Sequence, residues 1–423
     1  MLIHSASQLL TLAGGPQRGL ELGSLGIIPD GAVLVQGKTI VAVGTTSELR
    51  TAYPHEPTLD AAGQVVMPGF VDPHTHLVWA GSRAAEFELR LQGKTYLEIL
   101  AAGGGILSTV TATRQASLQT LLSETRLRAR TLFRHGTTTA EAKTGYGLEA
   151  AAELRQLEAL LILDKEGPLE IAPTFLGAHA IPPEFQHTPD DYVTLLCEGM
   201  LPQVAAWWLE RCPQRPLPFV DIFCDQGAFN LPQARRILKA AAALGFPLKV
   251  HADEFEPLGA STLAVDLAAV SADHLVKTPP EAIARLAHSS TVAVSLPCTP
   301  FGLGDPHYTP AQEILKAGGL LAIASDLNPG TAWCESMQFV IALACRYLRL
   351  TPAQAIAAAT INAAAAIQRQ AQIGSLEPGK QADLILLSVD DYRDLGYRFG
   401  TNLVTQVIKK GQVFNSSSPF PAA

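Results

Sequence analysis

Residues 69–81 read GFVDPHTHLVWAG, a short apolar run that ends in two histidines, His74 and His76, separated by one threonine. Side chains two positions apart in an extended chain point the same way, about 6–7 Å apart, so both imidazoles can reach one metal ion. A single histidine at a strand end is more often a hydrogen-bonded structural residue, and the pair alone leaves both interpretations open. Other polar residues of the chain are needed to distinguish a metal site from a structural role.

This stretch is the first of eight apolar runs that alternate with alanine- and leucine-rich helical segments. Buried parallel strands read as continuous apolar runs of this kind. Eight such units predict an α/β fold, a closed (β/α)8 TIM-like barrel, although a doubly wound open sheet has a similar pattern. The runs are GFVDPHTH, TTTAEAKTGYG, EIAPTFLGAH, FVDIFCDQGAF, PLKVHADEF, AVSADHL, TVAVSLPCTPF and LLAIASDLNPG.

The two ends of the chain have a different character. Residues 32–44, AVLVQGKTIVAVG, alternate apolar and polar side chains around a glycine turn, which is a hairpin signal. Residues 382–389 and 405–414 have the same character. We therefore expect a small β-sandwich domain built from both termini, residues 1–65 and 370–423, and a barrel over residues 66–369.

Composition excludes several classes of function. The chain has 423 residues, 48% of them hydrophobic and 17% charged, and a net charge of −8, so nucleic acid and anionic membranes are not expected partners. The amino terminus lacks a signal-peptide pattern, and no apolar segment reaches the roughly 18–20 residues that span a bilayer. The six cysteines show no CxxC pairing and indicate free thiols in a reducing compartment. We expect a cytoplasmic protein.

Polar residues gather where barrels keep their active sites, at the carboxyl ends of the strands. Five of the eleven histidines and one aspartate end the predicted strands: His74, His76, His179, His251, His274 and Asp326. This set favours a metal site over a structural role for the His74–His76 pair. Neutral imidazoles with a carboxylate suit zinc or iron and leave room for a water, whose pKa the metal would lower towards 7 to give hydroxide.

Two further polar residues lie near these strand ends. Asp72 is expected to support the site or to cap its loop, without a catalytic role. Lys143 ends the second run and could bridge two metals as a carbamate. We favour an ion pair with a carboxylate such as Glu141, or a substrate contact.

These residues resemble the amidohydrolase superfamily, whose members combine a (β/α)8 barrel with a β-sandwich made from both termini. PGFVDPHTH resembles its first-strand signature, and GSLEPGKQADLILL, residues 374–387, resembles the return into its sandwich domain. Two-metal members usually carry a carbamylated lysine on the fourth strand. The fourth run here, FVDIFCDQ, holds no lysine, so the resemblance implies one zinc or iron ion per subunit.

Within that superfamily the chain is similar, over nearly its whole length, to the imidazolonepropionase family of histidine degradation. That family hydrolyses 4-imidazolone-5-propanoate to N-formimidoyl-L-glutamate by opening the five-membered ring. The resemblance implies a small-molecule substrate and a homodimer. The motifs that carry it are AGSRAAEFELRLQGKTYLEILAAGGGILSTVTATR, KTGYGLE, FLGAHAIPPE, HADEFEPLGA, SADHL and SDLNPG.

Motif by motif, the resemblance implies a role for each of these residues. The implied metal ligands are His74, His76, His251 and Asp326. The implied substrate contacts are Arg83, Tyr146, His179, Glu254, Asn328, Gly330 and Thr331. The implied catalytic residues are His274 at the end of the sixth strand, Asp326, His179 and Glu254.

The residue types suit this chemistry. Arginine binds a carboxylate through two parallel hydrogen bonds, so Arg83 fits the propanoate arm of the substrate. His274 or the metal-bound Asp326 is expected to take the proton of the attacking water, and the metal with His179 to stabilise the oxyanion.

Two other functions remain open. The first is another ring hydrolase or deaminase on this scaffold, acting on a nucleobase or a hydantoin-like ring. Arg83 favours a substrate with a carboxylate over a bare nucleobase. The second is a catalytically inactive binding protein of the same fold, which would be expected to lose metal ligands, and none is missing here.

Overall fold

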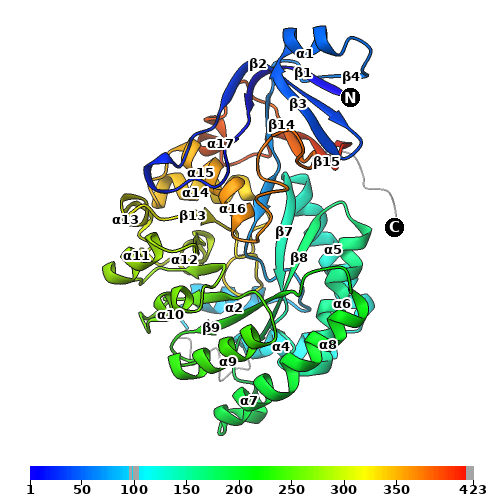
Figure 1. The fold of residues 1–423 in the computed structure, drawn as a ribbon. Coiled ribbons are helices and arrows are strands. Elements are labelled where there is room, and N and C mark those ends of the chain that lie inside the picture. Colours follow the sequence, from blue (N-terminus) through cyan, green and yellow to red (C-terminus); the bar gives the residue numbers. More distant parts are fainter. Residues whose placement is uncertain (95–97, 99–103, 416–423) are drawn as a thin grey trace.

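The computed structural model describes residues 1–94, 98 and 104–415 (Figure 1). Residues 95–97 and 99–103, inside the family-specific segment that begins AGSRAAEF, lie outside the described residues, as do residues 416–423 of the expected terminal domain. Figure 1 shows a sheet built from both chain ends at one end of the molecule, with the long middle of the chain at the other.

The middle of the chain forms a sheet of eight strands in the order β13-β12-β11-β10-β9-β8-β7-β6, all pairs parallel. The sheet closes on itself, because Asp326 N–H donates to His74 C=O (3.1 Å) and His76 N–H donates to Leu327 C=O (2.8 Å). This closure confirms the barrel and excludes the open sheet. The strands are β6 (Phe70–Asp72), β7 (Thr137–Lys143), β8 (Glu170–Ala178), β9 (Phe219–Cys224), β10 (Lys249–Ala252), β11 (Ser271–His274), β12 (Val292–Ser295) and β13 (Leu321–Ile323).

Helices surround this barrel, and local signals set several of their starts. Asn230 caps α9 through a reciprocal pair of hydrogen bonds with Gln233, and Ser117 accepts from Thr120 N–H at the start of α5. The helices are α2 (Ala84–Leu91), α4 (Ile106–Gln115), α5 (Leu118–Arg134), α6 (Ala150–Glu166), α7 (Pro189–Leu195), α8 (Leu201–Arg211), α9 (Leu231–Ala243), α10 (Ala260–Asp266), α11 (Pro280–Ala287), α12 (Cys298–Leu303), α13 (Ala311–Lys316), α14 (Met337–Tyr347), α15 (Pro352–Ala358) and α16 (Ile361–Ala365).

The chain ends form a second, mixed sheet in the order β16-β15-β14-β5-β1-β2-β3, with β4 paired to β1. Antiparallel pairing of β14 with β5 joins the two ends of the chain, and the predicted hairpins are β2–β3 and β15–β16. The domain bounds at residues 65 and 370 stay a prediction. The strands are β1 (Leu2–Leu10), β2 (Ile27–Gln36), β3 (Thr39–Thr45), β4 (Thr58–Asp60), β5 (Val65–Pro68), β14 (Leu384–Leu387), β15 (Val404–Lys409) and β16 (Gln412–Asn415), with the helices α1 (Thr46–Ala52) and α17 (Asp394–Tyr397).

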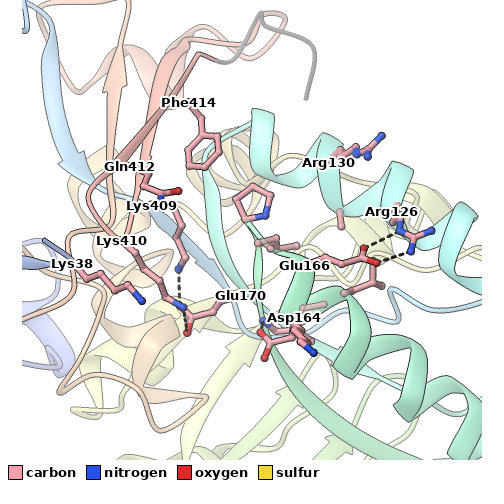
Figure 2. A pocket seen from close by; sticks show the side chains of 17 residues that line it. Lys38, Arg126, Arg130, Asp164, Glu166, Glu170, Lys409, Lys410, Gln412 and Phe414 are labelled. Atoms are coloured by element: carbon pink, nitrogen blue, oxygen red, sulfur yellow. Dashed lines mark hydrogen bonds and ion pairs between the residues drawn. The ribbon is translucent and has the colours of Figure 1, made fainter. Parts of the chain in front are cut away.

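The two sheets meet at a charged junction (Figure 2). The Lys409 ammonium lies 2.6 Å from a carboxylate oxygen of Asp383 and 2.7 Å from one of Glu170. Glu170 is the first residue of β8, so the terminal sheet packs against the amino ends of the barrel strands. The opposite, carboxyl ends of the strands are thereby left for a site.

No helix within the described part of the chain is long and apolar enough to cross a membrane. All six cysteines are free thiols, as their spacing predicts. The described residues also include three short helical segments: the 3-10 helices η1 (Gly19–Glu21) and η2 (Pro183–Phe185) and the π-helical turn η3 (Leu196–Met200) between α7 and α8.

Candidate metal centre and active site

Three histidines converge at the carboxyl ends of β6 and β10. His74 and His76 follow β6, and His251 lies in β10; all three are buried. The ring centroid of His74 lies 5.4 Å from that of His76 and 4.5 Å from that of His251. The Nε2 atoms of His76 and His251 are 3.3 Å apart, so both rings present the same atom to a common point.

Asp326 completes this cluster from the loop after β13. Its Oδ1 lies 3.5 Å from Nε2 of both His74 and His76, while its other oxygen accepts from the Thr299 hydroxyl. Its φ of +52° lies in the left-handed region, which costs a non-glycine residue energy and occurs often at functional sites.

The unpartnered atoms of the cluster fit a metal ion. Among the described residues, Oδ1 of Asp326 and Nε2 of His74 are buried without a hydrogen-bond partner. A buried polar atom without a partner is costly, and a cation between a carboxylate oxygen and imidazole nitrogens removes that cost. Burial lowers the pKa of His74 and of His76 well below the usual value, which keeps both rings in the neutral form that binds metals.

Two buried aspartates that were not predicted from the sequence lie next to the Nδ1 atoms of His74 and His251. Asp273 Oδ2 lies 2.6 Å from Nδ1 of His74, and Asp221 Oδ2 lies 3.0 Å from Nδ1 of His251. Carboxylates in this position fix the ring orientation and make the other ring nitrogen a better ligand. Asp221 lies in FVDIFCDQ and Asp273 in AVSADHL, and an acid within each of these strand-like runs was the signal that could have found them.

Lys143 forms the ion pairs that its position predicts. Its ammonium lies 2.9 Å from a Glu141 oxygen and 2.8 Å from an Asp221 oxygen, and all three side chains are fully buried. Burial alone would lower the pKa of Lys143, but the carboxylates of Asp221 and Glu141 outweigh it and raise the pKa. The raised pKa favours the cationic amine, which suits these two ion pairs.

Asp72 supports the loop that carries Asp326, as expected. One of its oxygens accepts from the Ser325 N–H (3.1 Å) and the other from the Ser325 hydroxyl (2.5 Å). It therefore ties the end of β6 to the residue just before Asp326.

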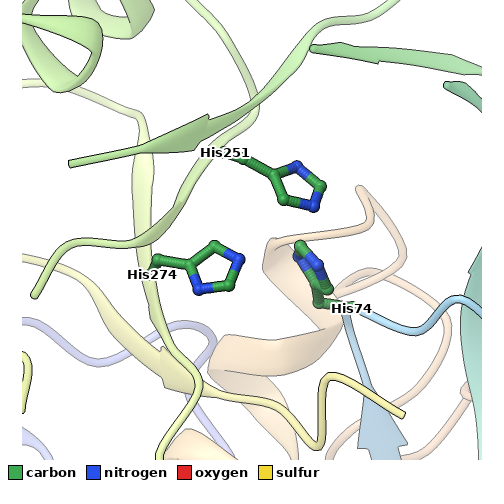
Figure 3. A group of neighbouring side chains, drawn as sticks. All are labelled: His74, His251 and His274. Carbon is green, nitrogen blue, oxygen red and sulfur yellow. The ribbon is translucent and has the colours of Figure 1, made fainter. Parts of the chain in front are cut away.

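His274 ends β11 beside the cluster. Its ring centroid lies 5.1 Å from that of His251 and 5.5 Å from that of His74, and Figure 3 shows the three rings around a common space. His274 with His74 and His251 forms a second geometrically acceptable ligand set beside that of His74, His76 and Asp326. The geometry thus places His274 where it can reach either an ion or a water next to it.

Glu254 faces His274 across the site. Its Oε2 lies 3.6 Å from Nε2 of His274, and its side chain is nine-tenths buried. Burial, with Asp326 and Asp225 nearby, raises the pKa of Glu254 well above its usual value, so the group tends to hold a proton. Asp225 was not predicted; its carboxylate accepts from the N–H groups of Glu254 and Phe255 (both 3.0 Å) and of Glu256 (3.1 Å), and so fixes this turn.

Tyr146 and His179 lie beside His76. The His179 ring stacks on His76 at 4.8 Å, and the ring of Tyr146 lies 5.2 Å from that of His179. Burial is the main cause that lowers the pKa of His179, to about 3, so its ring is neutral. Nδ1 of His179 lies 3.0 Å from the carbonyl of Gly145, which places the ring proton on Nδ1 and leaves Nε2 as an acceptor.

Arg83 lies against the loop after β13. Arg83 pairs with Glu86 through two hydrogen bonds, 2.5 Å from Nη2 and 3.0 Å from Nε. Gly330 packs so closely that a Cβ there would lie 2.3 Å from Nη1 of Arg83. Asn328 Oδ1 accepts from the N–H groups of Gly330 and Thr331, both at 2.8 Å, and so shapes the loop.

The predicted histidines, Tyr146, Glu254 and Asp326 lie around one cluster, and Arg83 contacts Gly330 of the loop that follows Asp326; the roles of these residues stay predictions. The Thr331 hydroxyl bonds to Asn328 within the loop.

Comparison with known proteins identifies the family. A profile of the amidohydrolase family matches residues 65–414, and one described as an imidazolonepropionase-like composite domain of bacteria matches residues 31–55. The imidazolonepropionase of Herpetosiphon aurantiacus is 54% identical over 97% of this chain and 96% of its own. The chain belongs to the imidazolonepropionase family of amidohydrolases.

Two further imidazolonepropionases are similar to this chain over nearly its full length. The imidazolonepropionase of Chloroflexus aggregans is 50% identical over 98% of both chains, and that of Symbiobacterium thermophilum is 48% identical over 98% of this chain and 96% of its own.

Among solved structures, a zinc-bound adenosine deaminase from Xanthomonas campestris has a TM-score of 0.72 at 20% identity, covering 97% of this chain and 92% of its own. The guanine deaminase of E. coli has a TM-score of 0.70 at 15% identity, covering 98% of each chain. These two share the imidazolonepropionase fold.

Proposed function

We propose that this chain hydrolyses 4-imidazolone-5-propanoate to N-formimidoyl-L-glutamate, a step of histidine degradation. The observation that carries the proposal is the 54% identity, over nearly the full length of both chains, to a protein named imidazolonepropionase. The site supports it, because an arginine that suits a carboxylate lies against the loop that follows the metal-ligand candidate Asp326.

His74, His76 and His251 through Nε2, and Asp326 through Oδ1, are the proposed ligands of one zinc or iron ion. Such an ion, when bound, supplies a Lewis acid that makes a water acidic and polarises a carbonyl. The aspartates behind His74 and His251 keep these rings turned to it.

The proposed proton transfers involve His274, Asp326 and Glu254. Water adds to the ring carbonyl carbon, and His274 or Asp326 takes its proton; the ring C–N bond then breaks and the nitrogen gains a proton. Glu254, which lies 3.6 Å from His274 and whose pKa burial raises, is the proposed donor to the leaving nitrogen.

Several side chains are proposed to contact the substrate. Arg83 is proposed to bind the propanoate arm, sharing its guanidinium between the substrate and Glu86. Tyr146, Asn328, Gly330 and Thr331 are proposed to line the space beside it. A neutral His179 offers Nε2 as an acceptor, so we propose that it accepts a ring N–H of the substrate rather than stabilising an oxyanion.

A panel assay tests the proposal. Metal-analysed protein is incubated separately with imidazolone propanoate, guanine and cytosine, and products are followed by mass spectrometry. Formimidoylglutamate from the first substrate alone supports the proposal, whereas turnover of guanine or cytosine alone assigns the chain to the deaminases that share its fold. No turnover of any substrate at full metal occupancy favours the inactive binding protein.

The assembly and the compartment are also proposals. A homodimer is expected from the family resemblance, and light scattering after size exclusion measures it. A cytoplasmic location fits the free cysteines, and cell fractionation tests it.

A further inference from the structure

The loop that carries Tyr146 is held by a buried carboxylate that has no role in the scheme above. Glu153 lies in the first turns of α6, and its side chain is fully buried. Its Oε1 accepts from the N–H groups of Gly147 (2.7 Å) and Leu148 (2.9 Å), and its Oε2 accepts from that of Gly145 (3.0 Å). One carboxylate therefore accepts hydrogen bonds from three backbone N–H groups of the short loop 144–148.

The backbone of this loop depends on these acceptors. Gly145 has φ +110°, and a Cβ there would lie 3.0 Å from His179 Nδ1. Leu148, which is not glycine, has φ +54°. Left-handed conformations persist only where the surroundings enforce them, and buried N–H groups require acceptors. Glu153 supplies both the acceptors and the constraint.

The same loop carries two parts of the substrate site. The Tyr146 ring lies 5.9 Å from that of His76 and 5.2 Å from that of His179. The Gly145 carbonyl accepts the Nδ1–H of His179 at 3.0 Å and so sets which ring nitrogen of His179 can accept from a ligand. A shift of the loop would move the tyrosine and release the histidine together.

We propose that Glu153 is a positioning residue for substrate binding and turnover, which acts by holding loop 144–148 so that Tyr146 and the tautomer of His179 are set before the substrate arrives. The inference rests on the proposed function, because that function gives these two side chains a substrate to contact. Preorganised contacts matter because a misplacement of about 1 Å costs about 100-fold in rate.

The direct test is Glu153→Gln, which keeps the shape of the side chain but presents an NH2 group to N–H groups that need an acceptor. The matched control is Glu158→Gln on the same helix, where the side chain is 35% exposed and pairs with Arg211. With folding and metal content unchanged, we expect Glu153→Gln to lower kcat/KM for imidazolone propanoate by ~10–100-fold. The control should stay within about twofold of the wild type. Equal activity of the two variants overturns the inference.

A double-mutant cycle with Tyr146→Phe separates positioning from general stability. If Glu153 acts through the loop, Glu153→Gln costs less in the Tyr146→Phe background than in the wild type. Equal costs in both backgrounds overturn the inference. Should Glu153→Gln fail to fold, Gln156→Met provides a milder change, since Gln156 Oε1 accepts from the Tyr146 N–H at 3.4 Å. It should show a smaller loss with the same non-additivity.

Amide hydrogen exchange provides a readout that needs no turnover. In metal-loaded full-length protein, a peptide spanning residues 144–149 should exchange faster in Glu153→Gln than in Glu158→Gln. Unchanged exchange overturns the holding role. A wild type that does not turn over imidazolone propanoate contradicts the proposed function instead, and the exchange result then decides the holding role alone.

Discussion

Oδ2 of Asp273 lies 2.6 Å from Nδ1 of His74, with both side chains fully buried. Because this contact occupies Nδ1, Nε2 is the atom that His74 can offer to a metal ion, and it faces Asp326 at 3.5 Å. Asp221 Oδ2 likewise lies near His251, 3.0 Å from its Nδ1. The orientation of the proposed ligands is therefore built into the barrel interior.

Asp273→Asn should weaken metal binding. The amide keeps the size of the side chain but is a poorer acceptor for the Nδ1–H of His74, so we expect metal affinity to fall by ~10–100-fold. Competition with a chelator followed by metal analysis measures the affinity. Asp266→Asn is the control, because Asp266 is a surface residue paired with Arg285. Wild-type affinity in Asp273→Asn would contradict the role of this contact.

His274→Ala should keep the metal and lose activity. Loss of a general base or acid costs ~10²–10⁴-fold in rate, so kcat should fall by this amount while metal content stays at one ion per chain. His288→Ala, at the exposed end of α11, is the matched control. Near-normal turnover would remove His274 from the mechanism, and loss of the ion would make it a ligand.

Gly330→Ala should impair binding of the carboxylate arm. The added Cβ would lie 2.3 Å from Nη1 of Arg83, so the guanidinium has to move. Because charge-assisted hydrogen bonds contribute about 1.5–3 kcal/mol, we expect KM to rise by ~10–100-fold, with a smaller change in kcat. The control is Gly400→Ala, where a Cβ meets nothing within 4 Å. An unchanged KM would argue against Arg83 as the carboxylate contact.

Lys409→Met should destabilise the junction of the two sheets in a pH-dependent way. Removing one partner of a buried ion pair costs about 3–5 kcal/mol, here because Asp383 and Glu170 lose their cation. Burial alone would raise the pKa of Glu170, but Lys409 and Arg369 lower it well below its usual 4.5. This stabilisation is present above pH ~4.5 and is lost as the pH falls towards the folded-state pKa.

Thermal unfolding of the wild type and Lys409→Met at several pH values measures this effect. The difference in Tm should be largest near neutral pH and shrink in acid. Lys410→Met is the control, since Lys410 is 37% exposed and exposed pairs contribute about 0–1 kcal/mol. A difference in Tm that does not change with pH would contradict the linkage to Glu170.

Much of the barrel and the proposed ligand set could be predicted because both leave short-range patterns. The spacing of His74 and His76 follows from the two-residue period of an extended chain, and the other polar residues end apolar runs. Closure of the barrel could not be predicted, since it depends on backbone hydrogen bonds between residues about 250 positions apart, such as Asp326 to His74.

The acidic residues that support the site could not be predicted in this way. Asp221 and Asp273 lie inside apolar runs, where one acid gives no sign of which histidine it meets. Glu153 looks like an ordinary helix residue, and Asp225 like a loop acid. Their roles arise from backbone N–H groups and imidazoles that the fold brings to them, and a single sequence does not encode those distances locally.

Titration of metal-free protein with zinc or iron decides whether this chain is a metal-dependent ring hydrolase. Formimidoylglutamate formation from imidazolone propanoate is measured against bound metal for the wild type and for His74→Ala. We expect turnover to rise with metal occupancy and to saturate at one ion per chain. In His74→Ala both turnover and tight metal binding should be lost. Full occupancy without product, or equal turnover in metal-free protein, would contradict this assignment.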